Sequence, residues 1–371
     1  MASAVAKLRT RIEGISLSIA RQKEILQDLE KQKSAAQGEL NAILDPMSRM
    51  PLEISSDIFT RCLSTSPTFL PRDAPSLFLN VCRAWRNIAL GTPSLWAAIN
   101  DEGIQVAELP KLVEAWISRA RTFPLSLSLH GSLLAWPHNG TSNRNYEAPA
   151  GVPAPVGAMV KQHAHQIQNL ELCVPCEEEL EAMTFAFTSL RSFQYPDGNS
   201  TAVILRNLTL PALRTLFLSQ LDITPTDFLS FLTRSSPPLQ SLRVRLGRVT
   251  DSHDIQQYLR LLPGLTDLDI ERPIRPIRFR LPLLLRTVAD LLPNLRSLTV
   301  RDDIAWDRED YQGVLDVLTS HRTSLESFRI IVHGNGSGNR PPDDIVVALR
   351  QLVEDGMHIH IGTKEQNEID L

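Results

Sequence analysis

The first part of the chain has a helical alternation of apolar positions. From Leu8 to Ile43 the seam residues recur at alternating steps of four and three, and only Gln22 and Lys33 among them are polar. This heptad pattern predicts one long helix that ends at Asp45-Pro46, because proline cannot continue the hydrogen-bond ladder. Such a helix is about 54 Å long over residues 8–43. The seam consists of Leu8, Ile12, Ile15, Ile19, Gln22, Leu26, Leu29, Lys33, Ala36, Leu40 and Ile43.

Two interpretations of this seam remain open. In one, residues 8–43 form a parallel coiled-coil homodimer, in which Gln22 and Lys33 fix the register at some cost in stability. In the other, the helix folds back along the rest of its own chain. We favour self-association, because a single amphipathic helix of this length does not bury its apolar side chains alone.

Two shorter apolar stripes follow between residues 50 and 96. Met50-Pro51 is a helix-start signal, because proline is tolerated where the first amide has no intrahelical partner. Glu53 lies in the first turn, where a negative charge suits the helix dipole. A second helix is predicted from Leu77 to Leu90, with Leu77, Val81, Trp85 and Ile88 at helical spacing.

The remainder of the chain alternates strand-like and helix-like segments. Leu125, Leu127 and Leu129 alternate with polar residues, which is the period of a strand. A template L-x-x-L-x-L then recurs seven times, with its central positions at residues 170, 193, 216, 242, 268, 298 and 328. This template is typical of leucine-rich repeats and predicts a curved solenoid with a parallel sheet on one side and helices on the other. The alternative is a doubly wound α/β sheet, which also alternates strands and helices.

Composition and charge narrow the class of protein. Hydrophobic residues make up 43% of the chain and charged residues 22%, which is ordinary globular usage. The net charge of −4 gives no overall reason to expect nucleic acid or an anionic membrane as a partner. Four cysteines in 371 residues indicate a reducing compartment rather than a disulfide scaffold. We therefore expect an intracellular protein, cytoplasmic or nuclear.

The strands of the repeat carry the candidate binding residues. Leucines of the template point to the core, so the residues between them lie on the opposite face. Arginine and carboxylate strips then lie side by side, with one aromatic residue next to them, as is typical of interfaces. The alternative is an ordinary solvated face. The predicted target-binding residues are Phe217, Arg243, Arg245, Asp269, Glu271, Arg301 and Arg329.

Motifs for catalysis are weak. The chain has no glycine-rich phosphate loop, no G-x-S-x-G elbow and no HExxH. Cys173 and Cys176 form a CxxC just after His163 and His165, but no second CxxC completes a zinc set. We predict no catalytic residues, no metal, no cofactor and no enzymatic activity.

The stretch from Met50 to Trp96 resembles an F-box. Its motifs are Met-Pro-Leu-Glu-Ile at residue 50, Ile58-Phe59, Val-Cys-Arg-Ala-Trp at residue 81 and Pro-Ser-Leu-Trp at residue 93. Together with the repeats, the chain is similar to the fungal F-box proteins with leucine-rich-like repeats. The resemblance implies an adaptor-binding module marked by Pro51, Leu52, Ile54, Ile58, Phe59, Val81 and Trp85.

That resemblance implies a function and a domain plan. The chain would be a substrate-recognition subunit of a Skp-cullin-F-box ubiquitin ligase, bound through a Skp-type adaptor to a cullin and through its repeats to a target protein. The alternative is a non-catalytic coiled-coil and repeat scaffold without a link to ubiquitin. The predicted α/β plan is a coiled-coil helix (1–45), an F-box-like domain (46–100), a linker helix (101–122) and a leucine-rich-repeat-like domain (123–371) with a flexible loop at 131–156.

Overall fold

The computed structural model of the chain contains two compact units, Met1–Trp96 and Ala97–Leu371. The structure describes residues 2–64, 67–101, 109–130, 155–173, 185–196, 201–218, 223–245, 252–271, 281–302, 306–320, 325–332, 341–363, 367 and 369. The loop predicted at 131–156 therefore lies outside the described residues except at 155 and 156, where helix α6 begins. No helix in the described part of the chain is both long and apolar enough to cross a membrane.

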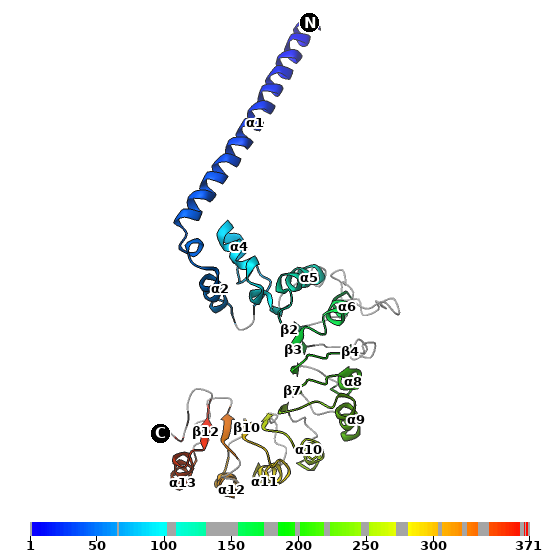
Figure 1. Cartoon of the computed structure of the whole chain (residues 1–371), viewed down its shortest axis with the longest axis vertical. Coiled ribbons are helices and arrows are strands. Elements are labelled where there is room, and N and C mark those ends of the chain that lie inside the picture. Colours follow the sequence, from blue (N-terminus) through cyan, green and yellow to red (C-terminus); the bar gives the residue numbers. More distant parts are fainter. Residues whose placement is uncertain are drawn as a thin grey trace. The chain divides into compact units, whose positions relative to one another are not determined.

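The first unit begins with one long helix, α1 (Ala2–Leu44), as the heptad pattern predicts (Figure 1). Its apolar seam is exposed: the exposed fraction is 62% for Ile12, 56% for Leu26 and 70% for Ile43. The end of the helix is defined by Asp45, whose carboxylate accepts a hydrogen bond from the Met47 amide at 2.9 Å and caps the following turn. Within its own unit, the α1 helix contacts α4 and the turn η1.

Short helices form the rest of the first unit. They are η1 (Pro46–Arg49), α2 (Leu52–Arg61), α3 (Phe78–Val81), α4 (Arg83–Gly91) and η2 (Pro93–Trp96). Their core is aromatic: the Phe59 ring stacks on Phe78 at 4.2 Å and tilts against Trp85 at 5.0 Å. Trp96 is fully buried, and its indole nitrogen donates to the Ala89 carbonyl at 2.9 Å.

The helix predicted from Leu77 to Leu90 is wrong as a single element, because it divides at Cys82. This residue is extended (φ −156°, ψ 174°) and its thiol accepts a hydrogen bond from the Trp85 amide at 3.5 Å. Cys82 thus takes the role of a helix cap, which polar side chains usually fill. The break also changes which residues are buried: of the predicted stripe, Leu77 and Val81 are 41% and 51% exposed, whereas Phe78, outside the stripe, is buried.

The second unit contains one ten-stranded parallel sheet. The strands follow each other in space in chain order, β1-β2-β3-β5-β7-β8-β9-β10-β11-β12, with β1 and β12 at the edges. Two short strands, β4 (Phe185–Ala186) and β6 (Leu208–Thr209), pair separately. The sheet consists of β1 (Ala98–Asn100), β2 (Leu125–His130), β3 (Ile167–Cys173), β5 (Ser192–Tyr195), β7 (Thr215–Leu218), β8 (Ser241–Arg245), β9 (Asp267–Glu271), β10 (Ser297–Asp302), β11 (Ser327–Val332) and β12 (His358–Gly362).

Helices connect the strands and lie together on one face of the sheet (Figure 1). Neighbouring helices pack on each other along the row. In every connection except the one between β3 and β5, whose residues 174–184 lie outside the described part of the chain, the structure describes a helix in the crossover, as is usual between parallel strands. The helices are α5 (Leu109–Ala120), α6 (Pro155–Gln162), α8 (Thr201–Asn207), α9 (Pro225–Ser235), α10 (Ser252–Leu259), α11 (Leu281–Leu291), α12 (Arg308–Ser320) and α13 (Asp343–Glu354).

The strand register aligns the apolar residues into buried rows. One row crosses all ten strands, and each of its members is at most 6% exposed. All seven template matches lie on strands of this sheet, because their leucine positions fall in these rows. The row consists of Ile99, Leu127, Leu170, Phe193, Leu216, Leu242, Leu268, Leu298, Phe328 and Ile359.

Replacement of glycine by alanine is expected to change stability in opposite directions at two positions. A Cβ added at Gly14, inside α1, meets nothing within 4 Å, so Gly14→Ala is expected to stabilise the helix by about 0.5–1 kcal/mol. Gly356, after α13, also has open space, but its φ of +103° disfavours any side chain. Gly356→Ala is therefore expected to destabilise the second unit, by about 1 kcal/mol or more. Circular dichroism at 222 nm during thermal unfolding measures both, and equal signs would contradict the assignment of these backbone conformations.

Candidate functional site

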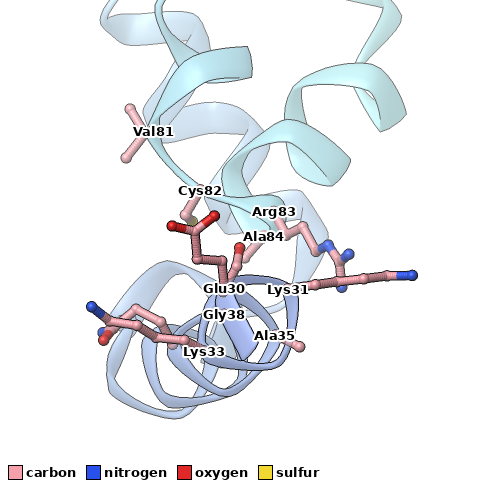
Figure 2. Close-up of a pocket in the computed structure, with 11 residues that line it drawn as sticks. Glu30, Lys31, Lys33, Ala35, Gly38, Val81, Cys82, Arg83 and Ala84 are labelled. Atoms are coloured by element: carbon pink, nitrogen blue, oxygen red, sulfur yellow. The ribbon is translucent and has the colours of Figure 1, made fainter. Parts of the chain in front are cut away.

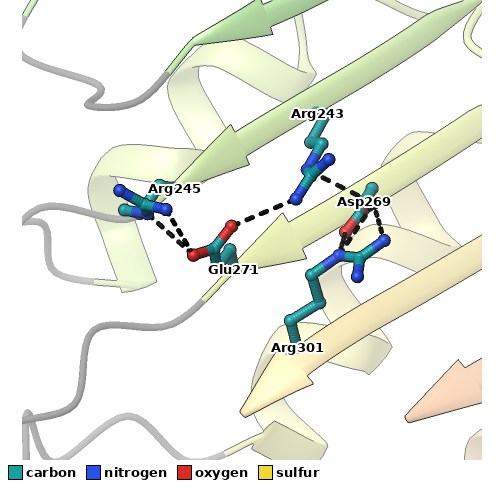
Figure 3. Close-up of polar contacts among 5 residues, drawn as sticks. All are labelled: Arg243, Arg245, Asp269, Glu271 and Arg301. Atoms are coloured by element: carbon teal, nitrogen blue, oxygen red, sulfur yellow. Dashed lines mark hydrogen bonds and ion pairs between the residues drawn. The ribbon is translucent and has the colours of Figure 1, made fainter. Parts of the chain in front are cut away.

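The solvent face of the sheet carries a connected set of charged side chains on β8, β9 and β10 (Figure 3). Parallel pairing places Arg243 beside Asp269, and Glu271 between Arg245 and Arg301. These residues alternate along each strand with the buried rows, so they point away from the helices. We call Arg243, Arg245, Asp269, Glu271 and Arg301 the charged ladder.

Two arginines of the charged ladder are tightly held. Arg301 donates to both carboxylate oxygens of Asp269, with Nη2 at 2.9 Å from Oδ2 and Nε at 3.0 Å from Oδ1. Arg245 contacts the Glu271 carboxylate at 2.7 Å through Nη2 and at 2.8 Å through Nε. Paired N–H groups on one carboxylate fix the guanidinium plane as well as its charge.

Arg243 is held less tightly than the other two. Its Nη2 lies 3.4 Å from Glu271 Oε2, and its Nε lies 3.6 Å from Asp269 Oδ2 without a hydrogen bond. Its guanidinium carbon lies 4.6 Å from the centre of the Phe217 ring, which is a cation–π distance. Arg243 therefore touches both carboxylates and the aromatic ring while leaving donor capacity unused.

The structure places the seven predicted target-binding residues on one face, with two differences from the sequence-based expectation. Phe217 is 8% exposed rather than an exposed aromatic, because Arg243 covers its ring. Arg329, on β11, is exposed and is separated from Asp269 by Thr299. Sequence reasoning placed Thr299 on this face without naming it as a binding residue and did not place His360 there, although the strand register puts both in the same row as Arg243 and Arg329.

The residues predicted to bind an adaptor divide into two groups. Phe59 is buried, and Trp85 packs on it and on Phe78, so these two belong to the core of the first unit. Ile58 is half-buried, and Pro51 is exposed at the start of α2. Leu52, Ile54 and Val81 are each 50–52% exposed. Met50 and Leu77 are further exposed apolar residues of this unit, which the sequence stripe did not separate from the core.

A groove of about 700 Å³ lies between the C-terminal half of α1 and the junction of α3 and α4 (Figure 2). Glu30, Lys31 and Lys33 line it on the α1 side. Val81, Cys82 and Arg83 line the opposite side, where the Cys82 thiol lies 3.4 Å from Asp45 Oδ2. The thiol thus serves as a structural link between the end of α1 and α4.

The CxxC considered for metal or redox chemistry is only partly described by the structure. The described residues contain no group of three or more His, Cys, Asp or Glu side chains arranged to hold a metal ion. The His163 and His165 rings lie 6.4 Å apart, and burial together with the charge of His165 lowers the pKa of His163. Cys176 of the CxxC lies outside the described residues.

Comparisons with known proteins find little. No family model matches the chain, and no curated protein matches it. Among solved structures, the chain is similar to a family 2 AP endonuclease from Brucella melitensis, with 11% sequence identity and a TM-score of 0.25. The match covers 66% of this chain and 95% of that chain. A likeness at this level assigns neither a fold nor an activity to the chain.

These findings correct the family assignment. No family model and no curated protein supports an F-box in this chain. The resemblance to F-box proteins with leucine-rich-like repeats is withdrawn. So are the function that followed from it, its scaffold alternative and the prediction that the chain is not an enzyme. We assign no reaction in their place.

The predicted fold class is corrected in the same way. Instead of an F-box followed by a repeat solenoid, the second unit is a ten-stranded parallel sheet that begins at β1. The fold class was wrong for a physical reason. The L-x-x-L-x-L template indicates buried parallel strands, and the spacing between its copies indicates the length of each strand–helix unit. Neither property distinguishes a leucine-rich solenoid from other sheets built of parallel strands and crossover helices.

Proposed function

We propose that the second unit binds an acidic segment of a partner protein on the solvent face of β7–β11. The observation that supports this proposal is the charge of that face. The charged ladder has three arginines for two carboxylates, and Arg329 adds a fourth arginine without an ion pair in the described part of the chain. Asp267 on β9 is exposed on the same face, so this face of β7–β11 carries four arginines and three carboxylates and has a small positive charge, although the whole chain has a net charge of −4.

The rigidity of the strands favours recognition over a merely solvated surface. Arg301 and Arg245 are locked onto carboxylates, so the positions of the surrounding donors are fixed before a ligand arrives. Pre-organised donors lose less side-chain entropy on binding than free surface arginines do. The Arg243 side chain is 38% exposed and weakly held, so an incoming carboxylate can engage the outer part of its guanidinium, which lies over the Phe217 ring.

The spacing of the available arginines defines the ligand. Arg243 and Arg329 lie three strands apart in one row, which corresponds to about 14 Å. An extended peptide covers that span with about four residues. The proposal therefore specifies a segment with acidic side chains about four residues apart, crossing the strands over Asp269 and Thr299.

A peptide series in which only charge varies tests the proposal. Full-length protein is titrated against a fluorescent peptide with two glutamates four residues apart and against the same peptide with glutamines. We expect the Arg243→Glu/Arg329→Glu double variant to lose affinity for the glutamate peptide by about tenfold or more. The control Arg260→Glu, an exposed arginine immediately after α10 on the helix side, should bind as the unsubstituted chain does. Equal binding of both peptides, or equal loss in the control, would contradict the proposal.

We also propose that the protein works inside the cell, in the cytoplasm or the nucleus. The support is its cysteine usage: four cysteines occur in 371 residues, and Cys62 and Cys82 are free thiols. Free thiols persist where glutathione keeps the environment reducing.

A further inference from the structure

The exposed seam of α1 has a polar pattern that bears on what covers it. In heptad notation, Lys33 occupies an a position and Gln22 a d position. Every other seam residue from Leu8 to Ile43 is apolar, and the leucines and isoleucines among them are 47–70% exposed. A partner for this seam must therefore offer apolar side chains throughout, and something suitable for Lys33 and Gln22.

A second copy of α1 meets this requirement better in an antiparallel than in a parallel arrangement. In a parallel dimer in register, Lys33 faces Lys33 of the second copy, so two ammonium groups share one buried layer, and Gln22 faces Gln22. In an antiparallel dimer, a positions lie opposite d positions. In the register that places Ile12 opposite Ile43, Lys33 lies opposite Gln22 of the second copy, and the amide oxygen of Gln22 can accept from the ammonium group.

The same antiparallel register pairs all the remaining seam positions from Ile12 to Ile43 as apolar layers. Leu26 lies opposite Leu29 at the centre, and Ile12 lies opposite Ile43 at the ends. The other layers pair Ile19 with Ala36 and Ile15 with Leu40. This register therefore buries the seam from Ile12 to Ile43 and places the two polar positions opposite each other.

The charged residues beside the seam also favour the antiparallel arrangement. Lys23 and Glu30 both occupy e positions, which flank e positions of the other helix in an antiparallel pair. In this register, Lys23 lies beside Glu30 of the second copy, and the contact occurs twice by symmetry. Neither residue has an ion pair within the described part of the chain. In the parallel dimer, Lys23 lies beside Ser18 and Glu30 beside Ile25, so neither charge has an opposite partner.

The first unit leaves the seam accessible. The α1 residues that line the groove beside α3 and α4 include Lys31, Ser34 and Gly38, which lie on the side of α1 away from the a and d positions. Lys33 is the single seam residue that lines the groove. We infer that two copies of this chain associate through α1 as an antiparallel coiled coil, with Lys33 of each copy opposite Gln22 of the other. This replaces the parallel arrangement that the heptad pattern alone suggested.

Cross-linking of full-length chains tests the direction. Ile15→Cys and Leu40→Cys are made separately, and one of the two carries a mass tag. In the proposed register, residues 15 and 40 face each other across the dimer, whereas two copies of residue 15 lie about 37 Å apart. Mild oxidation should therefore join the two variants only when they are mixed. Ile15→Cys mixed with Leu26→Cys is the matched control, and the unsubstituted chain shows the background from Cys62.

The alternatives give distinct results in the same experiment. Cross-linking of each variant with itself would establish the parallel dimer and overturn the inference. The inference would also be overturned if no specific cross-link formed and light scattering gave a monomer mass at about 50 μM protein. Protein associations of moderate affinity form at concentrations of this order.

Charge reversal provides an independent measurement. Lys23→Glu should raise the dissociation constant of the dimer by about five- to tenfold, because it places two glutamates side by side at each of two contacts. Lys23→Glu/Glu30→Lys restores the opposite pair and should restore the affinity. Arg21→Glu makes the same charge change at a position away from the seam and should have little effect. Failure of the double variant to recover would contradict the antiparallel contact.

Discussion

Replacement of Trp96 by alanine is expected to destabilise the first unit by about 3–5 kcal/mol, which is the range for truncating a large buried aromatic residue. Trp96 is fully buried, together with Leu95 and Ala89, so the cavity left behind has no solvent to fill it. The change also removes the indole N–H that donates to the Ala89 carbonyl. Hydrogen exchange of amides in residues 46–96 measures the effect within the full chain, without interference from the second unit.

Trp96→Phe separates packing from hydrogen bonding in this prediction. Phenylalanine retains most of the buried volume but cannot donate to Ala89. That carbonyl still accepts from the Thr92 amide at 3.3 Å, so the cost of the lost donor should be modest, about 1 kcal/mol, besides the smaller cavity. A comparable loss of protection in both variants would mean that the indole N–H, rather than packing, holds η2 against α4. No change in either variant would contradict the described core.

Local pattern predicted the elements of this chain well where periodicity was long or repeated. The heptad seam located α1, and the seven leucine templates located seven strands of the parallel sheet. These signals are reliable because each reflects one buried face with a fixed period. The break at Cys82 was not predicted, because a thiol acting as a helix cap has no distinctive sequence signal.

The charged face was predicted as a set of residues but not as a set of contacts. Alternation along a strand places Arg243 and Asp269 on the solvent side, yet only the register between strands brings Asp269 to both Arg243 and Arg301. Burial of Phe217 was missed for the same reason, since the covering guanidinium comes from the neighbouring strand. The predictions of fold class and function failed because short motifs do not specify how a sheet continues or what a surface binds.

Adjacent residues on β11 give the second large prediction, because they face opposite sides of the sheet. Phe328 is fully buried in the row that crosses all ten strands, so Phe328→Ala is expected to cost about 3–5 kcal/mol. Arg329 is exposed and has no ion pair in the described part of the chain. Arg329→Ala should therefore change stability by about 0.5 kcal/mol or less.

Thermal unfolding and peptide binding, measured on the same two variants, separate fold from function. For a unit of this size, the cost of Phe328→Ala corresponds to a fall in melting temperature of about 6–15 °C, and Arg329→Ala should leave the transition almost unchanged. Binding of the glutamate peptide is expected to show a different order: Arg329→Ala weakens it, whereas Phe328→Ala retains it at temperatures where the unit is still folded. If Arg329→Ala binds like the unsubstituted chain, the acidic segment does not reach β11, and the proposed site contracts to the charged ladder around Arg243.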